Sequence, residues 1–246
     1  MAMTPEIENH LHRENLAIAE AAQHVEGALI ALMDLALQDF EQTRQFAIPP
    51  SSSSAALVDA LGVGWQAGAA LGEEQIAQIK QTQLDTRGAV EYIRQYGLSR
   101  ARRITETTAK QLTQFVIKRQ RAGMPVPDIM RELVDKVPAM AATRAKIIAA
   151  TEVHSAAQFG AYNAALRGHR TLVKVWNTVE DDAVRDFRQG AQFSHAAMEG
   201  VKIALDIPFL IPHSGGGTEP LRFPGDPEGS AGNVINCRCV VTYEEA

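Results

Sequence analysis

Apolar residues recur at spacings of three, four or seven from the N-terminus to Phe40, which is the pattern of a single long helix. Thr4, Pro5 and Glu6 form a helix start, with a capping hydroxyl, a proline at the first helical position and an acid in the first turn. A helix of this extent is roughly 50 Å long, which is typical of a bundle or of a contact with another chain. Two prolines and a serine run predict that it ends in a loop or a short linker at 49–54. The apolar positions are Ile7, Leu11, Ile18, Ala22, Val25, Leu29, Leu32, Ala36 and Phe40.

Further helices are predicted as far as residue 168. Residues 55–96 have a helical pattern whose first part is loosened by glycines. Ser99 predicts the cap of a helix that runs to about residue 123. Prolines at 125, 127 and 138 bracket a short helix, and Thr143 opens another helix that Gly168 closes.

The character of the chain changes after residue 168. Residues 171–176 are rich in β-branched side chains, and short strands are predicted at 201–205, 207–211 and 234–243. The fold class that follows is α+β. We expect a helical N-terminal region over 1–142 and a small mixed α+β module over 143–246.

Composition limits the classes of protein that fit. A net charge of −5 argues against a protein that coats nucleic acid through its overall field. The only cysteines, Cys237 and Cys239, are too close in sequence for a relaxed disulfide, which indicates a reducing compartment. The start of the chain lacks the pattern of a signal peptide, and no uninterrupted apolar run approaches the length of a membrane span. We therefore expect a soluble protein that is made in the cytoplasm and has no membrane span.

A basic stripe lies along the helix predicted over 99–123. Its side chains could contact DNA phosphates or an acidic surface of a partner protein. The alternative is that they form a solvated helix face. The residues of this stripe are Arg100, Arg103, Lys110, Lys118 and Arg121.

Glu152 is a carboxylate in an apolar row, because it shares one side of its predicted helix with Ile148 and Phe159. A buried carboxylate needs a cation or a hydrogen-bond donor. We expect Glu152 to be buried and paired with Arg185 or Arg238. The alternative is exposure at the edge of the row.

Cys237 and Cys239 are candidate metal ligands. In a strand, residues two apart point to the same face, so both sulfurs would lie on one side. Two thiolates could form half of a structural zinc site, with His195 and His213 as the natural further ligands and Asp226 behind them. The alternative is two small, packed thiols. No other cofactor is expected.

Ordered sequence segments over 143–243 resemble the phage Mu F-like head morphogenesis family. The matching stretches are AATE at 149–152, KVWNT at 174–178, DDAVR at 181–185, SHAAMEG at 194–200, FPGDP at 223–227 and NCRC at 236–239. One departure is that 186–193 stand between the arginine and the histidine, which the family usually places a couple of residues apart.

The resemblance implies a minor head protein of a phage or prophage that is located in the virion. Its implied partners are the portal, the major capsid protein or both, and its implied role is in head assembly or in genome packaging or delivery. Two alternatives remain. One is an accessory enzyme, such as a nuclease or an ADP-ribosyl transferase, that uses Glu152, Arg185 and His195. The other is a DNA-binding adaptor that acts through the basic stripe. The usual hydrolase, P-loop, zinc-protease and dinucleotide motifs do not occur in the sequence.

Overall fold

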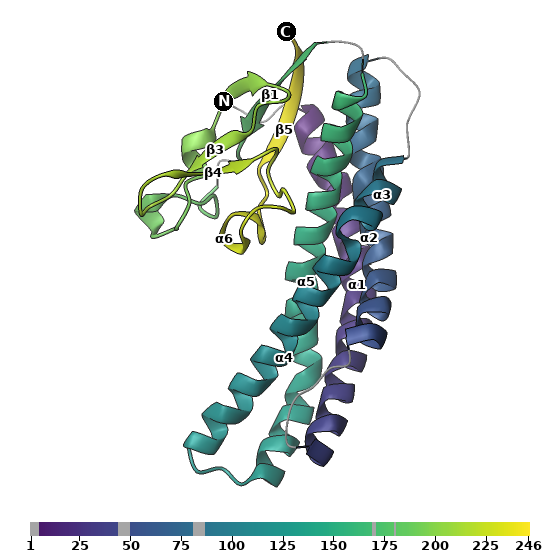
Figure 1. The fold of residues 1–246 in the computed structure, drawn as a ribbon, viewed down its shortest axis with the longest axis vertical. Helices are drawn as coiled ribbons and strands as arrows, with labels where there is room; N and C mark the ends of the chain where they lie inside the picture. Colours follow the sequence, from purple (N-terminus) through teal and green to yellow (C-terminus); the bar gives the residue numbers. More distant parts are fainter. Residues whose placement is uncertain (1–4, 44–49, 81–86, 169–170, 180) are drawn as a thin grey trace.

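A computed structural model of the protein describes residues 5–43, 50–80, 87–168, 171–179 and 181–246. The α+β prediction is confirmed: long helices fill the N-terminal part of the chain, and a small unit of short strands and turns follows. This unit lies beside one end of the helices, and the hairpin of α4 and α5 extends away from it (Figure 1). The predicted cap Thr4 and the predicted breaker Pro49 lie outside the described residues.

Within the described residues, the helical bundle consists of four long helices and a short connecting pair. The long helices are α1 (Pro5–Thr43), α2 (Pro50–Lys80), α4 (Leu98–Arg121) and α5 (Val126–Leu166), and α3 (Arg87–Tyr92) leads through a π-helical turn (Ile93–Gly97) into α4. The first helix agrees with the prediction. The serines at 51–54, predicted as a loop or a linker, instead belong to α2.

Two predicted helix starts are wrong. Ser99 does not cap α4, since the chain enters that helix directly from the π-helical turn and the Ser99 hydroxyl donates to the Tyr96 carbonyl at 2.9 Å. Thr143 lies inside α5, which continues through Pro138. Val137, Ala141 and Ala145 are all buried in the bundle, and this packing offsets the backbone hydrogen bond that proline removes. The division expected between 142 and 143 therefore lies within one helix.

The glycines of α2 do not loosen it. A methyl group on Gly68 would stand 2.3 Å from the Val153 carbonyl oxygen, and one on Gly72 would stand 1.9 Å from that of Ala157. These positions lie on one face of α2, where only a hydrogen atom leaves room for the backbone of α5. Close approach of the two helices follows.

The C-terminal module contains two small antiparallel sheets. One has the order β2 (Lys202–Ala204), β1 (Leu172–Asn177) and β5 (Val240–Glu245); the other pairs β3 (Phe209–Pro212) with β4 (Thr218–Leu221). Two 3₁₀ turns (Phe187–Gln189 and Ala196–Met198) and the helical turn α6 (Ala231–Val234) connect them. Trp176 pairs with Val241 across the first sheet, and its side chain is fully buried. The module and the bundle share one hydrophobic core, because Phe159 and Tyr162 of α5 both pack on Phe223.

Candidate metal centre

His195 is held by backbone and side-chain contacts that fix its tautomer. Its backbone N–H donates to the Arg185 carbonyl at 2.9 Å, and its Nε2 lies 2.8 Å from Asn233 Oδ1. The Asn233 amide nitrogen donates to Glu219 at 2.6 Å, so the amide oxygen faces the imidazole. An amide oxygen only accepts, and Nε2 therefore carries the proton. Nδ1 is left with a lone pair.

Glu219 anchors this chain of hydrogen bonds. Besides Asn233, its carboxylate accepts from the Ser230 backbone N–H at 2.6 Å and from the Ser230 hydroxyl at 2.7 Å. Burial would raise the pKa of Glu219, but the bonds from Ser230 and Asn233 outweigh it and lower the pKa. Glu219 thus stays ionised and keeps the Asn233 amide in one orientation.

The segment at 186–193, which separates Arg185 from His195, folds into a compact turn. Asp186 caps a 3₁₀ turn by accepting from the Arg188 backbone N–H, and Gly190 closes the turn with a φ of 76°. The Ala191 N–H then donates back to the Asp186 carbonyl at 3.2 Å. Because the ends of the turn meet, His195 still lies directly beside Arg185.

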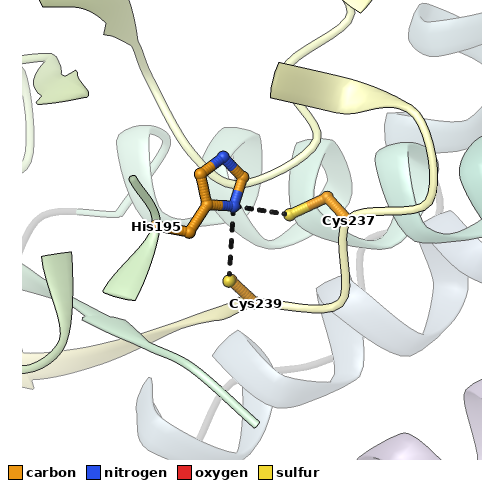
Figure 2. Close-up of side chains that lie close together, drawn as sticks. All are labelled: His195, Cys237 and Cys239. Atoms are coloured by element: carbon orange, nitrogen blue, oxygen red, sulfur yellow. Dashed lines mark hydrogen bonds between the residues drawn. The ribbon is translucent and has the colours of Figure 1, made fainter. Parts of the chain in front are cut away.

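Cys237 and Cys239 both face the free nitrogen of His195. Each sulfur lies 3.6 Å from His195 Nδ1, and Figure 2 shows the two sulfurs on the same side of the imidazole ring. Both thiols are buried. His195, Cys237 and Cys239 offer three ligand atoms that all lie within 4.8 Å of one another.

The predicted strand under these cysteines is wrong in its extent. Strand β5 begins at Val240, and the preceding residues form a turn in which Cys237 N–H donates to the Val234 carbonyl. Asn236 has a left-handed φ of 56°, and its N–H donates to the Thr151 hydroxyl at 2.9 Å. This turn, rather than strand alternation, brings both sulfurs to one side.

His154 and Glu14 form a second buried polar pair beside the thiols. His154 Nδ1, on α5, lies 2.7 Å from Glu14 Oε1, on α1, and both side chains are almost fully buried. Burial lowers the pKa of His154, but Glu14 and the neighbouring Cys237 thiol outweigh it and raise the pKa to about 10. Sequence reasoning missed this pair. Its signal was Glu14, which lies at helical spacing between Leu11 and Ile18 on the apolar side of α1.

The two thiols influence each other. The hydrogen bond with Cys239 is the largest cause that holds the pKa of Cys237 well below its usual range despite burial. The same bond and burial raise the pKa of Cys239 well above its usual range.

Glu152 is buried as predicted, but its partner is Arg100 rather than Arg185 or Arg238. The Arg100 guanidinium reaches its carboxylate at 2.6 Å, and Trp65 Nε1 donates to it at 3.2 Å. Arg185 instead donates to the Ile235 carbonyl, and Arg238 binds Asp181 at 2.7 Å. Arg100 is the partner because α4 packs on α5 at the level of Glu152.

The other predicted site residues do not lie at the two thiols. His213 is not in the group of ligand atoms; its Nδ1 accepts from the Gly215 N–H at 3.0 Å and its ring packs on Phe193 at 4.9 Å. Asp226 pairs with Arg222 at 2.5 Å. Arg100 was predicted to belong to the contact stripe, but it is buried and cannot contact a partner there. The other four residues, Arg103, Lys110, Lys118 and Arg121, are exposed along α4.

Two hollows adjoin these residues. A cavity of about 10 Å³, enough for roughly one water molecule, lies against His195 and Cys239 and is also lined by Arg185 and Asn236. A cleft of about 800 Å³ opens between α4, α5 and the turn of α6, with the Arg100–Glu152 pair in its wall.

No family model, curated protein or solved structure matches this chain. Within the described residues, one segment (Glu8–Phe40) is long and apolar enough to cross a membrane by length and composition alone. The core helix of a soluble protein also passes this test, and Val25, Leu29 and Met33 of this segment are fully buried in the bundle.

Proposed function

We propose that this chain is a minor head protein of a phage or prophage and acts through assembly contacts with the portal, the major capsid protein or both. The observation that carries the proposal is the convergence of the Mu F-like motif segments. The Trp176 ring lies 5.3 Å from that of His195, and His195 in turn faces the NCRC turn at 236–239. Residues 236–239 also reach Thr151 of the AATE stretch and Asp181 of the DDAVR stretch. An ordered motif set that forms one contact network supports a common module.

The long helices support an assembly role. At 1.5 Å per residue, α1 and α5, with 39 and 41 residues, each extend for about 60 Å. The α4–α5 hairpin extends away from the module, as Figure 1 shows, and carries the exposed basic side chains of α4. These cations suit an acidic partner surface or the phosphates of packaged DNA. The virion is the location that follows from this role.

The enzyme alternative has less support from the contacts of its residues. Glu152 is neutralised by Arg100, and the His195 side chain is buried with Nε2 bonded to Asn233 and Nδ1 facing the two thiols. A general acid or base needs to reach its substrate within hydrogen-bond distance. Burial against other residues of the chain favours a structural role for Glu152 and His195.

Mass spectrometry of purified particles tests the proposal. A host that carries the gene should release particles that contain peptides of this chain, and deletion of the gene should lower the yield of DNA-filled heads. A plasmid copy should restore that yield. If particles and head intermediates lack the chain, and deletion leaves the yield unchanged, the proposal is wrong.

A matched pair of variants then tests the basic side chains. One variant has Gln at all four exposed basic positions of α4, which are Arg103, Lys110, Lys118 and Arg121. It should fold, because these side chains are exposed, and it should be incorporated poorly, because it lacks their charge. Lys146 and Arg188, exposed elsewhere, provide the control substitutions to Gln. Equal incorporation of both variants would show that these basic side chains do not contribute to the assembly surface.

A further inference from the structure

We propose that His195, Cys237 and Cys239 bind one zinc ion, and that the Asn233–Glu219 and His154–Glu14 pairs orient and support its ligands. This inference does not depend on where the protein acts. It rests on the distances between the ligand atoms, on the chemistry of those atoms and on the hydrogen bonds behind them.

The ligand atoms have the spacing of a tetrahedral site. With zinc–nitrogen bonds of about 2.0–2.1 Å and zinc–sulfur bonds of about 2.3 Å, tetrahedral angles place nitrogen and sulfur about 3.5–3.6 Å apart. Both sulfurs lie 3.6 Å from His195 Nδ1. The two nitrogen–sulfur distances therefore already match those of a zinc site, and all three atoms lie within 4.8 Å of one another.

The ligand types select the metal. Thiolate sulfur and imidazole nitrogen favour zinc and other soft or borderline ions over magnesium and calcium, which prefer oxygen. Without an ion, two neutral thiols would compete for one hydrogen-bond acceptor, the lone pair of His195 Nδ1. The other ring nitrogen is already bonded to Asn233. A divalent cation satisfies all three groups at once.

The residues behind His195 prepare it as a ligand. A metal-binding histidine usually donates its other N–H to an oxygen acceptor, which fixes the ring and raises its basicity. Asn233 provides this acceptor, and Glu219 holds the Asn233 amide in the required orientation. The lone pair of Nδ1 thus points at the sulfurs whether or not an ion is present.

His154 supports the sulfur of Cys237. Its Nδ1 is engaged by Glu14, and its Nε2 is buried without a hydrogen-bond partner in the described part of the chain. His154 does not belong to the group of three ligand residues. We assign it as an N–H donor to the Cys237 thiolate, which neutralises part of the charge that two thiolates bring to a buried site.

The fourth ligand is a water molecule in the small cavity beside His195 and Cys239, which has room for roughly one. The ligands come from the loop before the second 3₁₀ turn and from the turn that precedes β5, while the supporting pairs reach α6, α5 and α1. The ion would therefore join the loop at His195 to the turn at 236–239, and His154 of α5 and Glu14 of α1 would connect that turn to the bundle.

Metal content and cobalt substitution test the site. Full-length protein made without a histidine tag should contain close to one equivalent of zinc. Protein reloaded with cobalt(II) should show near-ultraviolet thiolate-to-cobalt absorption, at about half the intensity in Cys239→Ser. His213→Ala is the matched control and should keep both signals, because His213 lies off the site.

Two further variants test the supporting hydrogen bonds. Asn233→Ala should weaken zinc affinity by about 10–100-fold, measured by competition with a chromogenic chelator. His154→Gln should weaken it while the stoichiometry stays at one; an unchanged affinity would remove His154 and Glu14 from the site.

If the ligand variants fail to fold, measurements on the wild-type protein still test whether zinc binds. Zinc should protect both thiols from a thiol reagent, and a chelator should expose them. Less than about a tenth of an equivalent of zinc, without cobalt absorption in protein whose thiols are reduced, would overturn the proposal.

Discussion

The helical bundle and the C-terminal module are held together by different kinds of contact. The bundle buries large apolar side chains such as Trp65, Leu57 and Leu61, and α2 lies so close to α5 that glycines are required between them. The module has strands of three to six residues, and Lys174 and Asn233 are fully buried within it. Short strands bury little apolar surface, so a small unit needs specific cross-links that a long bundle does not.

Metal removal should have the largest effect and should separate the two regions. A chelator is expected to loosen the module, because zinc would close its loops, and to leave the interior of the bundle protected. Hydrogen exchange should therefore accelerate in β1 and β5 but not in the middle of α2 and α5. Equal acceleration in both regions would show that they unfold as one unit.

The Arg100–Glu152 ion pair should carry the largest single effect inside the bundle. Glu152→Ala leaves a buried guanidinium without its carboxylate, which costs on the order of 3–5 kcal/mol of unfolding free energy. Urea unfolding measures it. The double variant Arg100→Met with Glu152→Met should recover most of the loss, since it removes both charges. The exposed Arg94–Glu91 pair is the control, and its removal should leave the midpoint unchanged.

The crossing of α2 and α5 should be sensitive to a single methyl group. Gly72→Ala is expected to destabilise the protein by about 1–3 kcal/mol or more, because the new Cβ would meet backbone atoms of α5. Gly62→Ala, on an open side of the same helix, should be neutral or stabilising by up to about 1 kcal/mol. Thermal unfolding of the two variants gives the comparison; similar melting temperatures would mean that the helices do not pack so closely.

The effect of Lys174 should be visible as a dependence of stability on pH. Burial lowers its pKa from 10.5 to about 8, although Asp226 and Asp206 act in the opposite direction. Between these values the unfolded chain holds more protons than the folded one, so this group contributes increasing stability as pH rises from 8 to 10.5. Wild type should gain stability relative to Lys174→Met over that window. Lys146→Met, on the exposed side of α5, is the control; a parallel pH curve for Lys174→Met would contradict the shift.

Local signals predicted most of the elements. The periodicity of α1 and the β-branched residues of β1 identified both, since each signal is repeated over many neighbouring residues. Thr143 misled because a capping signal is local, whereas both halves of α5 pack on one core and form a continuous helix. Ser99 misled because the chain is already helical before it, in the π-helical turn that leads into α4. The cysteine pair was identifiable as candidate ligands because two thiols stand at short spacing, and His195 was a candidate by residue type although it lies 42 positions before Cys237. His213 matched in residue type but not in place.

By itself, the sequence determined the α+β class, because helical periodicity and β-branched runs are local patterns, and the burial of Glu152, because it depends on spacing along one helix. Only the tertiary structure decided the partners. Arg100 and Glu152 stand 52 positions apart, and Glu14 and His154 stand 140 apart. The crossing of the helices decides which residues meet. Many weak contacts together determine that crossing, so no local sequence pattern predicts these pairs.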